Sequence, residues 1–161
     1  MKVVFLLLVV GIQVVVCRIK PSDIVKEANR HINTTKWSVA SNYGTGKGTN
    51  KCNQFVYDVL KKVGTDPPKR RWFIYSPIGA GEWGNPNSSY LKKKKCWENC
   101  KGSWRSGDVI SDSVHVAIIT DNKRTTSARH DKVVQNDWGF RSKGTGAKSS
   151  IKACWRYKYS C

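Results

Sequence analysis

Cys52 stands where a sulfur nucleophile would be expected in a folded chain. The segment before it, residues 43–51, is rich in glycine, threonine and asparagine and has no apolar period, which predicts a loop. The next dozen residues carry apolar side chains at the spacing of one helix face, and Gly64 follows as a typical C-terminal cap; the apolar positions are Phe55, Val56, Val59, Leu60 and Val63. We therefore expect a helix whose first turn contains Cys52.

The start of a helix suits a reactive thiol. Asn50 or Thr49 can cap the helix through a side-chain oxygen. The remaining unpaired N–H groups and the positive end of the helix dipole favour the thiolate over the thiol. The alternative is that Cys52 is a disulfide partner, as most cysteines of small secreted proteins are.

The cysteine count favours a free thiol. Residues 1–17 have one lysine followed by an apolar run, which is the pattern of a secretory signal peptide cleaved after Cys17. The run is shorter than the ~20 residues that a membrane-spanning helix needs, so we expect a secreted protein without stable membrane insertion. Cleavage would leave an odd number of cysteines, and one of them would stay unpaired in an oxidising compartment.

If Cys52 is free, four cysteines of the predicted mature chain remain: Cys96, Cys100, Cys154 and Cys161. We expect them to form two disulfides, for which three connectivities are possible. A bridge from the C-terminal pair to Cys96 or Cys100 would tie down the chain end. Zinc is disfavoured because the C-x3-C and C-x6-C spacings lack the usual second close pair of ligands. We therefore expect no metal.

His115 is the candidate base. It opens the stretch HVAIIT, which is typical of a buried strand, shortly after a turn and the short run Gly107-Asp108-Val109. A neutral imidazole there can take the proton of Cys52 or form a thiolate–imidazolium pair with it. His31 lies on the polar side of a predicted helix and His130 in a charged loop. A hydrogen-bonded structural histidine is the alternative interpretation of His115.

The elements that must position these residues predict an α+β fold. A short amphipathic helix follows Pro21, with Ser22 as its cap and apolar residues from Ile24 to Ile32. From residue 107 onward, short β-branched runs separated by turns predict an antiparallel meander of strands near 107–111, 114–120, 124–128 and 132–140. A last strand, 151–159, alternates strictly, which predicts one solvent-facing side. Residues 18–161 form one predicted domain.

The segment 65–95 between the helices and the strands is rich in proline, glycine, asparagine and lysine, with interspersed aromatic residues. We interpret it as a long loop that forms a wall of the substrate groove. For Trp83, packing in the core is an equal alternative. Two triplets, beginning at Asn33 and Asn87, fit the sequon for N-glycosylation.

The formal net charge is +18, which implies polyanionic surroundings such as bacterial wall polymers, anionic membranes or nucleic acid. The run Lys92–Lys95 is typical of a solvated loop that concentrates the protein on negative surfaces. Charge says nothing about the fold.

Taken together, several motifs resemble a known family. Tyr43-Gly44, Cys52 with Phe55-Val56, Gly107-Asp108-Val109 and His115-Val116-Ala117-Ile118 are similar to the NlpC-type, papain-like cysteine amidases of peptidoglycan, to which the CHAP amidases are related. The stretches AGEWGNP (80–86) and NDWGFR (136–141) resemble more closely the type VI secretion amidase effectors and the domesticated amidase effectors of arthropods. The resemblance covers residues 43–141, most of the predicted mature chain.

The resemblance implies a papain-like fold and a secreted antibacterial enzyme that cleaves an amide bond in the stem peptides or cross-links of bacterial peptidoglycan. Cys52 would be the nucleophile and His115 the general base, with no cofactor. The Cys52 N–H and the Tyr43 hydroxyl would bind the oxyanion, and Trp83 and Trp138 belong to the tryptophan stretches expected at the substrate. We expect a monomer whose partners are peptidoglycan and anionic wall polymers, and no nucleic acid.

The sequence departs from the family pattern in two places. Lys51 and Asn53 flank the cysteine, where the family has aspartate and serine. The third, orienting polar residue often lies about a dozen positions after the histidine, near Ser127 here; Ser127, Asn136 and Asp137 all remain candidates.

Two other functions compete with a peptidoglycan amidase. A non-catalytic cationic antimicrobial or wall-binding protein accounts for the charge and the aromatic residues, but not for a cysteine at a helix start followed by HVAII. A secreted nuclease would need two positioned histidines and a lysine, whereas only His115 is placed for chemistry.

Overall fold

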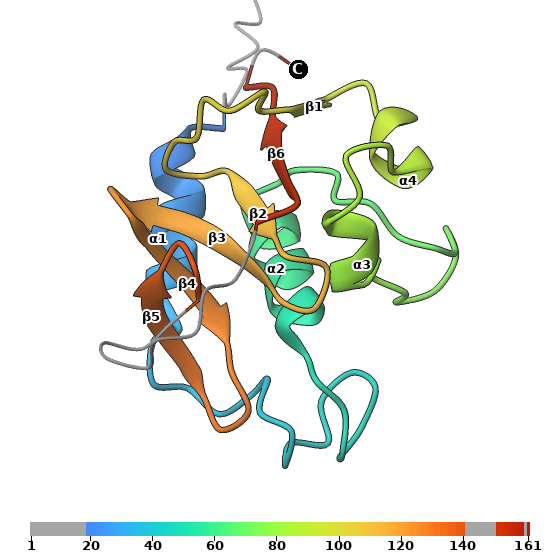
Figure 1. Cartoon of the computed structure of the whole chain (residues 1–161). Coiled ribbons are helices and arrows are strands. Elements are labelled where there is room, and N and C mark those ends of the chain that lie inside the picture. Colours follow the sequence, from blue (N-terminus) through green and yellow to red (C-terminus); the bar gives the residue numbers. More distant parts are fainter. Residues whose placement is uncertain (1–18, 141–150, 160) are drawn as a thin grey trace, which may run out of the picture.

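The computed structural model describes residues 19–140, 151–159 and 161 (Figure 1). The predicted signal segment 1–17, including Cys17, lies outside these residues. The described chain has an α+β fold, as predicted. Two helices, α1 (Pro21–Arg30) and α2 (Cys52–Lys62), lie on one face of an antiparallel sheet, and the short helices α3 (Ala80–Trp83) and α4 (Ser89–Lys92) flank it (Figure 1).

Helix α2 begins at Cys52, as its apolar spacing predicts, and Val63 is its C-cap. Gly64 follows with a φ of +90°, a left-handed conformation that suits glycine at a helix end. The predicted N-cap is wrong: Lys51 occupies that position and no side chain caps the helix. Helix α1 starts one residue before the predicted cap Ser22, and the backbone N–H of Lys20 donates to the Asp23 carboxylate.

The sheet contains β1 (Trp97–Asn99), β2 (Val109–Ser111), β3 (Val116–Asp121), β4 (Arg124–Ala128), β5 (Val133–Asp137) and β6 (Ala153–Tyr157). Their order is β1-β6-β2-β3-β4-β5, and every pair is antiparallel. The meander from β2 to β5 confirms the prediction. The C-terminal strand, however, lies between β1 and β2, and the sequence analysis did not predict β1.

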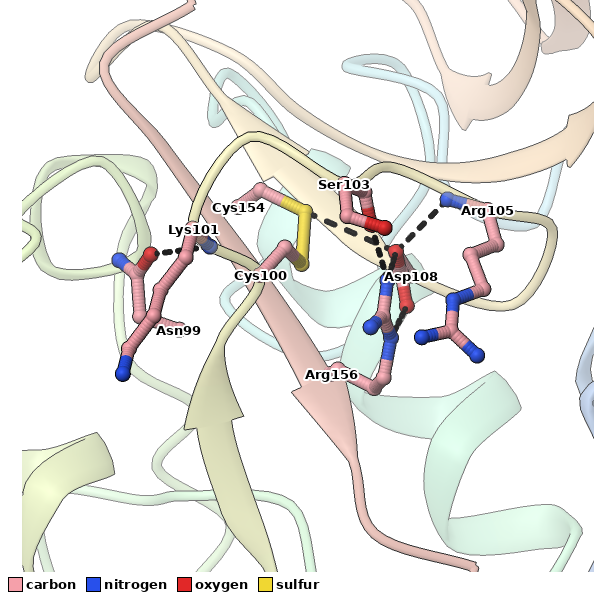
Figure 2. Close-up of polar contacts among 8 residues, drawn as sticks. All are labelled: Asn99, Cys100, Lys101, Ser103, Arg105, Asp108, Cys154 and Arg156. Carbon is pink, nitrogen blue, oxygen red and sulfur yellow. Dashed lines mark hydrogen bonds and ion pairs between the residues drawn. A yellow bond between two sulfur atoms is a disulfide. The ribbon is translucent and has the colours of Figure 1, made fainter.

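The predicted wet face of the last strand is wrong, because every residue of β6 is buried. Both of its faces are covered, one by the main core and the other by a second cluster of buried residues. Ala153 and Trp155 pack in the main core with the helices. Cys154 and Arg156 lie under the loop that joins β1 to β2, as Figure 2 shows.

Two disulfides close this part of the fold. Cys100 is bonded to Cys154, and Cys96 to Cys161. Both tie the C-terminal segment to the region around β1, in agreement with the expectation that such bridges would hold the chain end. In the described part of the chain, Cys52 is the free cysteine.

Asp108 organises the polar side of the same loop. Its carboxylate accepts bonds from Nε and Nη2 of Arg156 at 2.8 and 2.6 Å and from the Arg105 amide at 2.8 Å (Figure 2). Asp108, Cys100 and Cys154 form the one cluster of potential metal ligands among the residues described. Both sulfurs are used in the disulfide and the carboxylate is used by arginine, so the cluster has a structural explanation.

The main hydrophobic core fills the space between the helices and the sheet. Trp83 belongs to it, with 1% of its surface exposed and its ring 5.4 Å from that of Trp97. Its carbonyl oxygen accepts a bond from Nε1 of Trp155 at 3.0 Å. Core packing, the equal alternative for Trp83, is therefore the correct one. Within the described residues, none of the helices has the length and apolar character of a membrane span.

The surface features predicted from the sequence lie where expected. Asn33 and Asn87 are both exposed, as glycosylation would require. Glycosylation itself stays a prediction. The lysine run 92–95 begins at the last residue of α4 and lies at the surface, and Lys94 forms an ion pair with Asp66.

Candidate active site

Cys52 and His115 line the same hollow, which has a volume of about 380 Å³. Its walls come from the start of α2, the turn before β3, the end of β4 and Phe140 after β5. The predicted wall segment 65–95 contributes none of the residues that line this hollow. Its Tyr75 ring contacts that of Tyr57 on α2, and the Ile78 carbonyl accepts a bond from the Asn53 side chain.

Cys52 is nearly buried, with 6% of its surface exposed. Burial raises the pKa of the Cys52 thiol, and the negative charge of Asp112 raises it further. Backbone hydrogen bonds from Val116, Asn53 and Cys52 itself lower this pKa, as expected at a helix start, but burial outweighs them. The expected thiolate is therefore corrected to a neutral thiol in the resting protein.

The backbone of His115 is held by its own turn. Its N–H donates to Oδ1 of Asp112 at 2.6 Å, and its carbonyl accepts from Oγ of Ser111 at 2.7 Å. Strand β3 begins one residue later, at Val116, whose amide contacts the Cys52 sulfur. These backbone contacts hold His115 beside the start of α2.

The imidazole of His115 has two further neighbours. Its Nε2 lies 2.8 Å from Oγ of Ser127, and its ring meets that of Phe140 edge-on at 4.9 Å between centroids. Burial lowers the pKa of His115 to about 4, and the positive charge of Arg129 adds to the effect. The histidine is therefore a neutral base at physiological pH.

Of the three candidates for an orienting residue, Ser127 is the one that the structure joins to His115. Ser127 lies on β4, fully buried, on the strand next to β3. Asn136 and Asp137 lie on β5, at register positions opposite Thr125 and Arg124. The residue a dozen positions after the histidine is thus the one whose side chain bonds to the imidazole, and its role as an orienting residue stays a prediction.

Tyr43 and Trp138 do not line the hollow, so the structure does not bring them together with Cys52 and His115 there. Tyr43 borders a second hollow, beside α1 and α2, and its hydroxyl bonds to Asp58; burial and this carboxylate raise its pKa to about 12. Trp138 packs against Trp104 at 5.1 Å, on the sheet face away from the helices. Their places depend on packing that local spacing does not reveal.

Several residues of the hollow were not singled out from the sequence. Asp112 and Val114 lie three and one residues before His115, while Arg129 and His130 directly follow β4, the strand that contains Ser127. The sequence feature that could have identified them is that they are near neighbours in the chain of His115 and Ser127. Arg129 is oriented by a bond from Nη1 to the Phe140 carbonyl at 2.8 Å, and it brings a positive charge to the hollow.

Lys51, which directly precedes Cys52, is 2% exposed. Its Nζ donates to the carbonyl oxygens of Ser38 at 2.9 Å and Thr49 at 3.3 Å. Burial lowers its pKa. The lysine thereby ties the preceding glycine-rich loop to the start of α2, next to the thiol.

No family model matches the chain, and comparisons with curated proteins and with solved structures found no match either. The chemistry of the site must therefore be argued from its own residues. A thiol, a neutral imidazole and a serine hydroxyl bonded to that imidazole are the groups of a nucleophilic acyl transfer.

Proposed function

We propose that this protein is a secreted antibacterial hydrolase that cleaves an amide bond in the peptides of bacterial cell walls. The observation that supports it most is the arrangement of three residues. The free thiol of Cys52 lies at a helix start, and His115, bonded to Ser127, lines the same hollow. A merely structural free cysteine would not require a base of this kind beside it.

In the proposed reaction, His115 removes the Cys52 proton as the sulfur attacks the carbonyl carbon of the substrate amide. The C–N bond then breaks, the amine leaves with the proton held by the imidazole, and a thioester remains. Water then gives a proton to His115 and adds to the thioester. The C–S bond breaks, the carboxylic acid leaves and the thiol is restored.

The backbone N–H of Cys52 is the proposed donor to the oxyanion. It belongs to the first residue of α2, where N–H groups have no partner within the helix. Such a donor stabilises the negative oxygen of the tetrahedral intermediate. Tyr43, the other donor implied by the family resemblance, is bonded to Asp58 away from this hollow.

Charge supports a cell-wall substrate. The formal net charge of +18 attracts the protein to anionic wall polymers, and the hollow itself is bordered by both signs of charge, Arg129 and Asp112. Wall stem peptides carry free carboxylates and an amine of a diamino acid. We propose that Arg129 binds a substrate carboxylate near the cleaved bond.

The family resemblance and the topology support the same proposal. A cysteine on a helix precedes a histidine at the start of a strand in an antiparallel meander, the arrangement expected of a papain-like NlpC-type fold. Two disulfides are compatible with an extracellular location. We propose that the protein acts outside the cell as a monomer.

The test is to incubate purified peptidoglycan with the wild type and with Cys52→Ala, and to identify released fragments by mass spectrometry. We expect the variant to fold and to sediment with cell walls but to release no new fragments. Asn53→Ala, which changes the neighbouring helix residue, is the matched control. Equal release by wild type and Cys52→Ala would contradict the enzyme and favour the alternative, a non-catalytic cationic wall-binding protein.

A further inference from the structure

The loop between α2 and α3 projects from the body of the molecule (Figure 1). Lys69 and Pro77 form a β-bridge at its base, and the N–H of Arg70 donates to the carbonyl of Ser76 at 2.8 Å. These bonds close a short hairpin, residues 69–77, which we call the aromatic loop. Its backbone is thus held at the base while its tip faces solvent.

The tip of the aromatic loop carries large apolar side chains in an exposed position. Trp72, Phe73 and Ile74 are 81%, 64% and 44% exposed. By contrast, four other tryptophans are almost fully buried: Trp37, Trp83, Trp97 and Trp155. Consecutive exposed apolar side chains of this size mark a surface for interaction.

The base of the aromatic loop prevents the tip from folding back onto the core. The Tyr75 hydroxyl donates to Asp58 at 3.1 Å, and its ring meets that of Tyr57 at 5.4 Å. On the other side, Arg70 forms an ion pair with Glu82 at 2.7 Å. The exposed tip is therefore presented by a fixed base.

Positive charge surrounds the apolar tip. Lys69 and Arg71 belong to the loop and form no ion pair within the described residues. Lys61 lies 5.9 Å from the Tyr57 ring, next to the base. The nearby carboxylates are engaged: Asp58 accepts bonds from tyrosine and tryptophan donors, Glu82 pairs with Arg70, and Asp66 pairs with Lys94.

We propose that the aromatic loop docks the protein reversibly onto the surface of an anionic lipid bilayer. Tryptophan and phenylalanine favour the boundary between headgroups and acyl chains, and the flanking cations attract anionic headgroups. Single apolar tips of this size give reversible binding and do not span the bilayer. None of the residues of this loop lines the Cys52 hollow.

Vesicle binding tests this inference independently of catalysis, because the Cys52→Ala chain can be used throughout. We expect it to sediment with vesicles of phosphatidylethanolamine and phosphatidylglycerol at 3:1, and far less with phosphatidylcholine vesicles. The double variant Trp72→Ser/Phe73→Ser should bind the anionic vesicles about tenfold more weakly or worse. Tyr90→Ser, which removes an exposed aromatic on α4, should bind like the parent.

Fluorescence quenching by brominated phosphatidylglycerol locates the contact. We expect quenching in the parent that is lost in Trp72→Phe, a variant that keeps an apolar tip and still binds. Quenching that persists in Trp72→Phe would overturn the proposal, as would vesicle binding that the double variant leaves unchanged. Loss of binding to isolated, lipid-free cell walls in the double variant, with vesicle binding intact, would assign the loop to the wall polymer instead.

Discussion

Oγ of Ser127 lies 2.8 Å from Nε2 of His115, on the strand adjacent to the one that His115 precedes. A neutral imidazole has one donor nitrogen and one acceptor nitrogen. If Nε2–H donates to the serine, Nδ1 is the nitrogen left to accept a proton. The bond to Ser127 occupies Nε2 and so leaves Nδ1 for the proton transfer of the proposed reaction.

Ser127→Ala should therefore lower the turnover of wall peptides about tenfold or more, with little change in KM, because it removes an orienting bond and not a substrate contact. It should also cost about 1–3 kcal/mol of stability, since Nε2 loses its partner. Release of fragments over a range of substrate concentrations measures the first effect. Thr126→Ser, on the same strand, is the control; a Ser127→Ala enzyme with unchanged turnover would remove the serine from the site.

Alkylation by iodoacetamide tests the resting state of Cys52. Burial raises the pKa of this thiol, so we expect slower labelling at neutral pH than for a cysteine in a short peptide. The rate should rise with pH, and with unfolding by guanidinium. Mass spectrometry of the chain from residue 18 onward should find a single label. Labelling at neutral pH as fast as that of the peptide would show instead that the thiolate is already present.

The pH dependence of stability should carry a contribution from His115. The folded protein binds a proton there only near pH 4, while the unfolded chain does so near the ordinary histidine pKa of about 6.5. Because the unfolded chain binds this proton more tightly, acid favours unfolding. The free energy of unfolding should fall by up to about 3 kcal/mol as the pH drops from 6.5 to 4. Guanidinium unfolding at several pH values should show a smaller fall in His115→Gln. Equal falls in both proteins would contradict the lowered pKa.

Gly84 controls the turn that carries the base. A Cβ at this position would lie 2.4 Å from Oγ and 2.7 Å from the amide nitrogen of Ser113, two residues before His115. Gly84→Ala should thus displace the turn, destabilise the protein by about 1–3 kcal/mol and reduce fragment release. Gly81→Ala is the matched control, because its Cβ would meet only the Ser113 carbonyl at 3.8 Å. A fully active, equally stable Gly84→Ala protein would contradict this account.

The pair of Asp108 and Arg156 should be important for stability and not for chemistry. Asp108 is 1% exposed and accepts two bonds from the guanidinium, so Asp108→Asn leaves a buried cation without its counter-charge. We expect a loss of about 3–5 kcal/mol in guanidinium unfolding with the disulfides intact. Changing both Asp108 and Arg156 to leucine should recover part of the lost stability. Asp121→Asn, at an exposed strand end, should have little effect.

Local patterns predicted the parts of the fold that depend on neighbours in sequence. The 3.6-residue period of α2, Gly64 after it, and the β-branched runs of the meander each follow from backbone preferences over a few residues. The start of α2 shows the limit of this reasoning, because its N-cap is Lys51 and not one of the polar residues expected there. The buried lysine bonds to the carbonyls of a loop folded back over it.

By itself, then, the sequence determined an α+β chain with a thiol at a helix start, a histidine before a buried strand and four cysteines left for disulfides. Tertiary structure alone decided the disulfide pairing, which of the three candidates bonds to His115, the core position of Trp83 and the absence of Tyr43 from the hollow of Cys52. The strand β6 shows why: its alternation predicted one solvent-facing side, but it is buried on both faces. Segments that are distant in the sequence decide whether a residue is covered. The local spacing of apolar residues does not indicate which distant segments will pack on it.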